Sequence, residues 1–179
     1  MYSCIKLIDK KIGLIAHQKA SSLQNGVYNN AYGIPPGKLG SELLTESIQN
    51  LSNTYPHITQ IPDEKVIRIE GNFPEFEVFT NKNSYKTKTI VIGIGSANTF
   101  AIEGLMQFVT PHQKALPEKQ RIQLQNTDHK VTEGIYVIGT LAGWRSQLAI
   151  AAGSGAAVAT DILTLWNDGV QTHAHDSIR

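Results

Sequence analysis

The sequence predicts an α/β domain with a central sheet, a small antiparallel β-meander and helices packed against the sheet. Three observations predict this class. Short apolar runs bounded by glycine or polar residues recur along the chain, as in buried strands. Two neighbouring segments alternate apolar and polar residues, as half-buried antiparallel strands do. A long apolar segment near the C-terminus exceeds strand length and indicates a helix.

The composition sets limits on partners and compartment. The 179 residues are 41% hydrophobic and 17% charged, with a net charge of +1. This balance argues against disorder and gives no electrostatic sign of a nucleic-acid or membrane partner. The single cysteine, Cys4, excludes a disulfide framework and a Cys-x-x-Cys pair within the chain. Without a recognisable secretory signal, we expect a cytoplasmic protein.

The first elements follow from short patterns. Residues 11–16 form an apolar run that predicts a buried strand. Clustered Asn, Gly and Pro over residues 29–37 predict a loop. A helix is expected from Gly40 onward, with Ser41 as its N-cap, because leucine and isoleucine then recur at helical spacing.

The middle of the chain predicts strands. Residues 65–70 and 76–80 alternate and are expected to pair as a meander, with the turn at Gly71–Asn72. Residues 88–95 predict a buried strand that ends in glycines. Residues 100–130 show no clear period and are expected to be loop with one helix.

The C-terminal segment has the clearest pattern. Residues 134–139 predict a buried strand, residues 140–146 a polar loop, and residues 147–166 a long helix. The helix is apolar, but Arg145 directly precedes its apolar stretch and Asp161 lies near its end. A bilayer span needs about 20 mostly apolar residues, so a buried helix is favoured.

The first half of this helix is dense in Ala and Gly, which allows close approach of another surface. Its N-terminus would carry partial positive charge and unpaired N–H groups, which suit an anion or a polarised ring carbonyl. Tight helix–sheet packing without a ligand explains the same residues, and both interpretations stay open.

A family resemblance bears on this choice. Residues 131–140 read Val-Thr-Glu-Gly-Ile-Tyr-Val-Ile-Gly-Thr, and residues 147–157 read Gln-Leu-Ala-Ile-Ala-Ala-Gly-Ser-Gly-Ala-Ala. This pattern resembles the second FAD motif of the thioredoxin reductase family. In that family a strand ends in Gly-Asp, the Asp holds the ribityl chain, and a Gln with the following helix start meets the flavin ring.

Two further stretches agree in order. Residues 30–35 with Gly40 resemble the flavin-side loop of the family, and residues 89–96 resemble its Ala-Thr-Gly strand end. The resemblance implies an FAD/NAD(P)-binding Rossmann-like domain over residues 1–166, incomplete at its N-terminus, and a frayed tail over residues 167–179. It implies FAD contacts from Asn30, Gly95, Gly139, Thr140, Arg145, Gln147, Leu148, Ala149 and Ile150. It assigns no catalytic residue and no metal ligand.

The departures from the family are equally informative. The glycine turn that cradles the FAD pyrophosphate is missing before residue 11, and no acidic residue follows Ala16. Either the chain is N-terminally shortened or a hairpin replaces that turn. Thr140 stands where the family has Asp and keeps one hydroxyl. The gap between Ser96 and Val131 is too short for the NADPH domain of the family.

Two functions therefore remain open. The first is an FAD-dependent oxidoreductase reduced to its flavin domain, with FAD bound weakly or lost, and electrons supplied by an external donor or a redox partner protein. The second is a non-catalytic remnant that binds a partner protein or forms a homodimer without cofactor. No nucleic acid or membrane is expected in either case.

Other residues carry weaker predictions. Trp144 could cover a flavin or cap the edge of the core. His173, His175 and Asp176 contain metal-ligating groups but lie in a tail, where a solvated role is favoured. His17 lies near the expected adenosine ribose site or is simply a histidine at a strand end. Cys4 is expected to be inert. Asp161 and Glu133 show no paired-carboxylate pattern.

Overall fold

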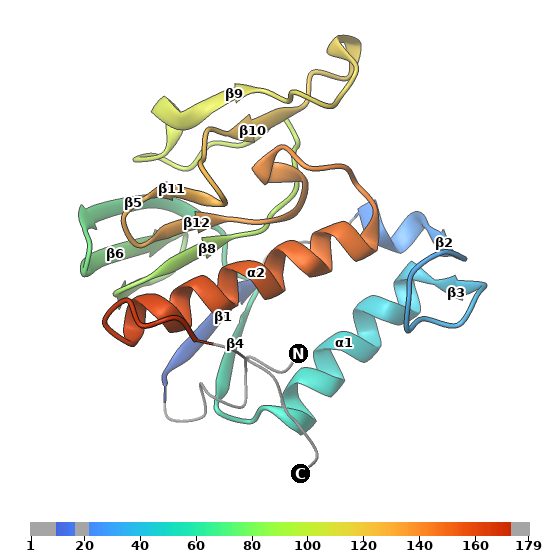
Figure 1. Ribbon diagram of the computed structural model, residues 1–179, viewed down its shortest axis with the longest axis horizontal. Helices are drawn as coiled ribbons and strands as arrows, with labels where there is room; N and C mark the ends of the chain where they lie inside the picture. The colour runs from blue at the N-terminus through green and yellow to red at the C-terminus, as the bar shows by residue number, and fades with distance from the viewer. Residues whose placement is uncertain (1–9, 17–21, 173–179) are drawn as a thin grey trace. The chain divides into compact units, whose positions relative to one another are not determined.

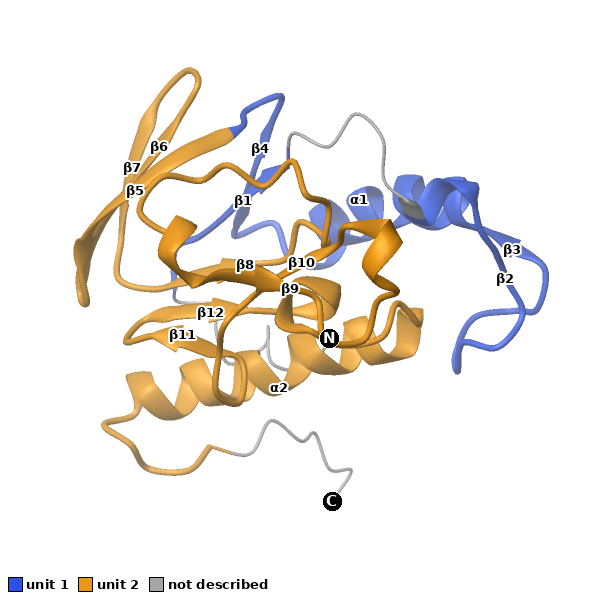
Figure 2. Ribbon diagram, turned by 90° about the horizontal axis from the view of Figure 1, so that it is seen from above, with its two compact units in different colours: residues 1–65, 174–179 blue, residues 66–173 orange. Residues whose placement is uncertain are grey.

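The computed structural model describes residues 10–16 and 22–172 (Figure 1). Contacts divide the chain into two compact units, unit 1 running to Lys65 and unit 2 beginning at Val66 (Figure 2). Both units combine helices and strands, so the predicted α/β class is confirmed. Cys4, His17 and the tail residues 173–176 lie outside the described residues, and the predicted domain boundary at residue 166 stays a prediction.

Unit 1 is built around one parallel strand pair and one helix. Strand β1 (Ile12–Ala16) pairs in parallel with β4 (Ile58–Pro62), with Ile12 opposite Ile58. A short antiparallel pair precedes the helix. The remaining elements of the unit are η2 (Ser22–Asn25), β2 (Val27–Tyr28), β3 (Lys38–Leu39) and α1 (Gly40–Thr54).

Two predictions for unit 1 need correction. The strand at residues 11–16 forms, but each of its residues is half-buried or exposed, because β1 has one sheet neighbour among the described strands. Ser41 is not the N-cap of α1. That position is Leu39, whose side chain cannot cap the helix, and its N–H donates to Glu42 Oε2 in the first turn at 3.4 Å.

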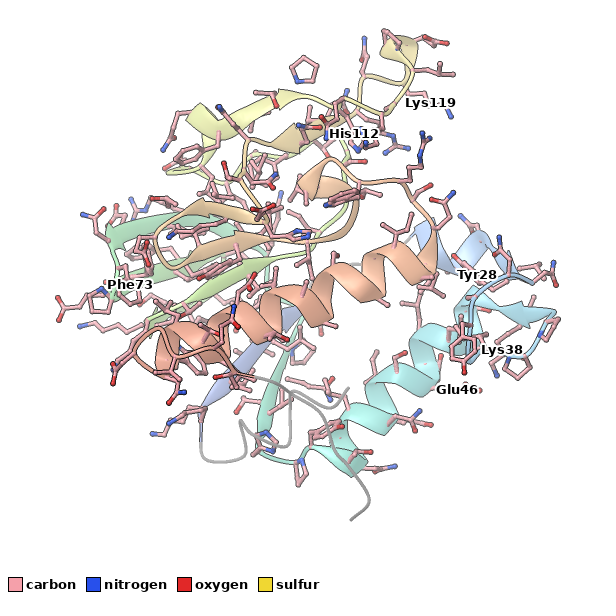
Figure 3. The ribbon with its side chains drawn as sticks, viewed as in Figure 1. Tyr28, Lys38, Glu46, Phe73, His112 and Lys119 are labelled. Carbon is pink, nitrogen blue, oxygen red and sulfur yellow. The ribbon has the colours of Figure 1, made fainter. Side chains whose placement is uncertain are left out.

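The start of α1 also carries an ion-pair cluster. Lys38 Nζ lies 2.5 Å from Glu46 Oε1 and 3.3 Å from Glu42 Oε2 (Figure 3). The hydrogen bond with Glu46 raises the pKa of Lys38 above its ordinary value. Because these groups are exposed to water, the cluster orients side chains more than it stabilises the unit.

Unit 2 contains three sheets and the long helix. The meander β5–β6–β7 is antiparallel, β9 and β10 form a hairpin, and the third sheet has the order β11–β12–β8. The elements are β5 (Val66–Asn72), β6 (Glu75–Thr80), β7 (Ser84–Thr87), β8 (Ile90–Ile92), η3 (Met106–Phe108), β9 (Val109–Pro111), η4 (Pro117–Lys119), β10 (Ile122–Leu124), β11 (Lys130–Thr132), β12 (Ile135–Val137), η5 (Gly139–Ala142) and α2 (Leu148–Trp166).

The predicted meander is confirmed, but its first turn lies at Phe73–Pro74, since Gly71 and Asn72 still pair within β5. The predicted central sheet is observed as two parallel pairs, β1–β4 in unit 1 and β8–β12 in unit 2. The prediction of a helix within residues 100–130 is wrong. This segment forms the β9–β10 hairpin with two short 3-10 turns, whose strands are too short to show a period.

One hydrophobic cluster of unit 2 lies between α2 and the β11–β12–β8 sheet. Tyr136 of β12 packs with Val158 and Ile162 of α2, and Figure 1 shows the helix running along this sheet. Trp166 Nε1–H donates to Thr89 Oγ1 at 3.2 Å and anchors the helix end.

Helix α2 is long and apolar enough to cross a membrane by length and composition alone. Its C-terminal half nevertheless contributes Val158, Ile162 and Leu163 to the protein core. The prediction of a buried helix is wrong for the N-terminal half, where mostly small residues are exposed. No close backbone contact explains Gly153, at which a Cβ would meet nothing within 4 Å.

Candidate functional site

The predicted flavin-binding residues of unit 2 gather at one edge of a parallel strand pair. Ile90 and Ile92 of β8 lie opposite Ile135 and Val137 of β12, so both strands end at the same edge. Beyond the strands the pairing continues, with Ile138 N–H donating to the Ile92 carbonyl at 2.9 Å. Ligands of open α/β sheets bind outside the carboxyl ends of such strands, and this edge is therefore the candidate site.

The end of β8 is shaped by two glycines with different roles. A Cβ at Gly93 would lie 2.9 Å from the Ile138 side chain, so Gly93 allows the two strand ends to approach. Gly95 has φ +79° and faces open space, with nothing within 4 Å of a Cβ. This backbone conformation favours glycine at position 95. The missing side chain leaves the main chain open to a ligand.

The end of β12 is tied to the first turns of α2. Gly139 is buried, with φ +64°, and its N–H donates to Ser154 Oγ at 2.8 Å. Ser154 Oγ–H in turn donates to the Ala151 carbonyl at 2.7 Å. Sequence reasoning missed Ser154; the only signal was a lone polar residue within an Ala/Gly stretch.

The turn between strand and helix is partly core. Leu141 is completely buried and Ala142 nearly so, which corrects the prediction of a polar loop over residues 140–146. Thr140 is half-buried, and its carbonyl accepts the Gly143 N–H at 3.0 Å. Within the described residues the Thr140 hydroxyl makes no hydrogen bond, so it is available to a ligand.

The N-terminus of α2 is open. Gln147 occupies the N-cap position with an exposed side chain that makes no capping hydrogen bond, while its carbonyl accepts the Ala151 N–H at 3.0 Å. The N–H groups at the start of a helix have no partner within the helix. No acidic residue lies in this first turn, so nothing offsets its partial positive charge. Leu148, Ala149 and Ile150 therefore present a backbone suited to carbonyl or anionic oxygens.

The remaining predicted residues lie elsewhere. Arg145 and Trp144 are exposed in the loop before α2, and Lys114 Nζ lies 5.5 Å from the centre of the Trp144 ring. Asn30 is exposed in the loop of unit 1, where the neighbouring Asn29 Oδ1 accepts the Gly37 N–H at 2.8 Å. The structure thus brings all predicted residues of unit 2 except Arg145 to the strand ends and the helix start.

Two ionisable side chains of unit 2 have shifted pKa values, and a third is held in an ion pair. Partial burial raises the pKa of Asp161, and the nearby His129 opposes this shift. Burial also raises the pKa of the Tyr136 phenol. Glu133 forms an ion pair with Lys130 at 2.5 Å. Among the described residues, no three His, Cys, Asp or Glu side chains are arranged to hold a metal ion.

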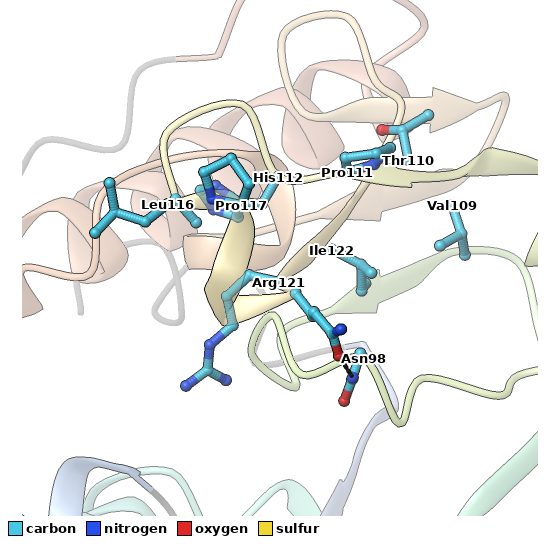
Figure 4. A pocket seen from close by; sticks show the side chains of 11 residues that line it. Asn98, Val109, Thr110, Pro111, His112, Leu116, Pro117, Arg121 and Ile122 are labelled. Atoms are coloured by element: carbon cyan, nitrogen blue, oxygen red, sulfur yellow. Dashed lines mark hydrogen bonds between the residues drawn. The ribbon is translucent and has the colours of Figure 1, made fainter.

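A separate cavity of about 560 Å³ lies against the β9–β10 hairpin (Figure 4). Its walls are mainly apolar, with Val109, Pro111 and Ile122 among them. At its edge Asn98 Nδ2 donates to Gln120 Oε1 at 3.3 Å. None of the predicted flavin-binding residues lines this cavity, so it does not extend the candidate site.

The candidate site fits one half of an FAD molecule. The helix start, the Thr140 hydroxyl and the open backbone at Gly95 suit a flavin ring and its ribityl chain. The pyrophosphate needs backbone N–H groups at a glycine turn, and no Gly-x-Gly-x-x-Gly turn occurs in the sequence. The residues present therefore suit the flavin side of FAD better than its pyrophosphate.

Comparisons with known proteins agree with this architecture. No protein-family profile and no curated protein sequence matches the chain. Among solved structures, a thioredoxin reductase from Gloeobacter violaceus matches with a TM-score of 0.72 and 12% identity, covering 99% of this chain and 93% of that chain. An oxidoreductase from Agrobacterium tumefaciens matches with a TM-score of 0.71 and 10% identity, covering 93% and 94%.

A ferredoxin-flavin thioredoxin reductase from Clostridium acetobutylicum also matches, with a TM-score of 0.67, 15% identity and coverage of 93% of both chains. The fold of this chain is therefore that of thioredoxin reductase-like oxidoreductases, and the predicted fold class is confirmed. At these identities the likeness establishes the fold alone.

Proposed function

We propose that this chain is a flavin-binding oxidoreductase domain that holds FAD at the edge formed by β8, β12 and the start of α2. One observation carries the proposal: the parallel strand ends and the N-terminal turn of α2, which has no side-chain cap, lie together in unit 2. The oxidoreductase-type fold supports it.

The residues of this site have distinct roles in the proposal. The Gln147 amide and the N–H groups of the first turn of α2 hydrogen-bond the polar edge of the flavin ring. The Thr140 hydroxyl holds the ribityl chain with a single hydrogen bond. FAD supplies the electron-transfer chemistry when bound, and the protein positions it. Electrons come from an external donor or a redox partner protein.

The proposal excludes one activity. Disulfide reductases of this fold need a dithiol, and the sequence contains one cysteine, Cys4. We expect the purified chain to show no NADPH-driven disulfide reduction by itself. The proposal is of a cytoplasmic protein, and the net charge of +1 supports the absence of a nucleic-acid or membrane partner.

Flavin binding is tested by titrating the purified chain with FAD and with riboflavin and following flavin fluorescence. We expect micromolar or weaker affinity, that is, a binding free energy of about −8 kcal/mol or less negative. FAD and riboflavin should bind with similar affinities, because the pyrophosphate has no glycine turn to bind it. Gln147→Ala should weaken binding and leave the melting temperature of the apoprotein nearly unchanged. Gln107→Ala, which removes an exposed amide elsewhere in unit 2, is the matched control. Absence of saturable flavin binding would contradict the proposal.

A second candidate function rests on a different observation. The N-terminal half of α2 exposes a stripe of small residues, namely Ala149, Ala152, Gly153, Ala156 and Ala157. Such a stripe allows a second helix to approach closely, which favours a homodimer or a partner-binding module without cofactor. Light scattering tests the dimer: Ala156→Glu should convert it to a monomer, whereas Gln107→Glu should not. A monomeric parent protein would remove the homodimer as a candidate.

A further inference from the structure

Unit 2 contains a polar cavity of about 270 Å³ beside Trp144. Four side-chain amides, one carboxylate, one imidazole and one indole line it, and none of these belongs to the predicted flavin-binding residues. Pockets for drug-sized ligands span roughly 300–1,000 Å³. This cavity therefore has room for a single ring.

The floor of the cavity is fixed by amide hydrogen bonds. Gln123 Oε1 accepts the Gln113 N–H at 2.9 Å, and Gln113 Nε2 donates to the Gly143 carbonyl at 3.3 Å. A Cβ at Gly143 would lie 2.6 Å from Gln123 Oε1 and 2.8 Å from Gln113 Nε2. Glycine is thus required at position 143 for two reasons: its φ of +85° disfavours other residues, and the two amides leave no room for a side chain.

One wall of the cavity is a tight turn with two residues in a conformation that favours glycine. Asp128 and His129 have φ +46° and +70°. The turn is closed by two hydrogen bonds between Thr127 and Lys130, at 2.9 and 3.0 Å. Turns of this kind prefer glycine in their second central position, and non-glycine residues held there concentrate at functional sites.

His129 is held on three sides. Its N–H donates to Asn126 Oδ1 at 3.1 Å, and its carbonyl accepts the Val137 N–H at 2.8 Å. Its Nδ1 lies 2.9 Å from the Val137 carbonyl. A carbonyl can only accept, so Nδ1 carries a proton and donates to it, and Nε2 is the ring nitrogen left for a ligand.

Several lining groups are available to a ligand. The Gln125 amide, the Asp128 carboxylate and the Trp144 indole N–H make no hydrogen bond within the described residues. Together with His129 Nε2 they present donors and acceptors around one small space. Hydroxyl groups satisfy both kinds of partner, and the apolar edges of a sugar ring suit an indole. We propose that this cavity binds one uncharged sugar ring, either a free sugar or the ribose of a nucleoside.

The experiment uses the full chain labelled with ¹⁵N and follows its two indole N–H signals by NMR. Trp144 lines the cavity, whereas Trp166 donates to Thr89 and serves as an internal reference. D-Ribose, D-glucose and uridine should shift the Trp144 signal saturably and leave the Trp166 signal in place. Tighter binding of uridine than of ribose identifies a nucleoside as the source, and equal or weaker binding identifies a free sugar.

Two variants separate a binding role from a structural one. Gln125→Ala should weaken binding at least tenfold, whereas Gln107→Ala should bind as the parent does. His129→Gly suits the turn conformation, so the protein should stay folded by circular dichroism while sugar affinity falls at least tenfold. The proposal is overturned if no probe binds saturably, if ethylene glycol shifts Trp144 as sugars do, or if both variants bind like the parent. The inference does not rest on flavin binding, and sugars should leave the flavin titration unchanged.

Discussion

The two units of the chain differ most in what they bury. Among the described residues of unit 1, the buried ones are Gly40 and Glu64, and no large apolar side chain is fully enclosed. Unit 2 contains the buried apolar side chains of the described chain, including Leu105, Leu124 and Leu141, which are completely inaccessible to water. Yet both units form helices and parallel strand pairs.

This difference shows that the apolar spacing that predicts a helix or strand is distinct from the burial that stabilises it. Helix α1 carries Leu43, Leu44 and Leu51 at helical spacing, but each is half-buried. Most helix stability in proteins comes from packing of an apolar face rather than from propensity. We infer that the stability of the chain is concentrated in unit 2, which also holds the candidate site.

The largest expected effect tests this concentration directly. Leu141→Ala removes a completely buried side chain of unit 2 and should lower the free energy of unfolding by about 2–5 kcal/mol. Leu14→Ala, at a 42% exposed position of β1, should change it by less than about 1 kcal/mol. Urea unfolding followed by circular dichroism measures both. Equal losses for the two variants would break the comparison.

Two glycines with the same φ, one in each unit, test whether the backbone of unit 2 is also more closely packed than that of unit 1. Gly104 and Gly37 both have φ +88°, but a Cβ at Gly104 would lie 2.2 Å from the Ile69 carbonyl oxygen, whereas one at Gly37 would meet nothing within 4 Å. Gly37→Ala should therefore cost only the left-handed strain, about 1–2 kcal/mol. Gly104→Ala adds a clash worth about 1–3 kcal/mol more. Thermal melts that rank Gly37→Ala as the worse variant would contradict this account.

Two serines, one in each unit, should give a smaller difference in the free energy of unfolding. Ser154 Oγ is buried and accepts the Gly139 N–H, so Ser154→Ala leaves a buried donor without a partner and should cost about 1–3 kcal/mol. Ser47 Oγ–H donates to the Leu43 carbonyl on the exposed side of α1. Its replacement by Ala should change stability by about 0.5 kcal/mol or less. The same denaturant series compares them, and a silent Ser154→Ala would show that the link from β12 to α2 is dispensable.

Apolar runs explain which parts of the fold could be predicted. The strand within residues 134–139 is a continuous apolar run between two glycines, and the apolar segment after Gln147 is too long for a strand, so both elements could be predicted and both form. The β9–β10 hairpin could not be predicted, because each strand has three residues and no period is visible. The burial of Leu141 could not be predicted either, since one leucine in a short turn has no pattern around it.

The residues of the candidate site also fall into those that could be predicted from the sequence and those that could not. Gly95, Gly139 and Thr140 follow strands that the sequence already predicts, so their common edge could be anticipated from a parallel sheet. Ser154 contacts Gly139, which is distant in the sequence. His129 contacts Val137 because a tight turn holds the histidine in place. Only the folded chain identifies such contacts.

The smallest expected effect concerns the pH dependence of stability. In unit 1, the Glu46 hydrogen bond raises the pKa of Lys38, which affects stability only at alkaline pH. In unit 2, partial burial raises the pKa of Asp161 above its ordinary value of 3.8, although the residue as a whole is exposed. A raised carboxyl pKa means that the folded state binds the proton more tightly than the unfolded state. The penalty of ionised Asp161 is therefore absent below pH 3.8, grows as pH rises toward the folded pKa, and stays constant above it.

Asp161→Asn removes this penalty, so the variant should melt slightly higher than the parent at pH 7, and the two melting temperatures should converge as the pH falls toward 3.8. The increase should be small because solvent screens the carboxyl. Gln107→Glu, an exposed change of charge elsewhere in unit 2, controls for net charge. A variant that melts below the parent at pH 7, with the gap closing as the pH falls, would mean that Asp161 is stabilised in its ionised form. In that case the neighbouring His129, rather than burial, would set the pKa of this carboxyl.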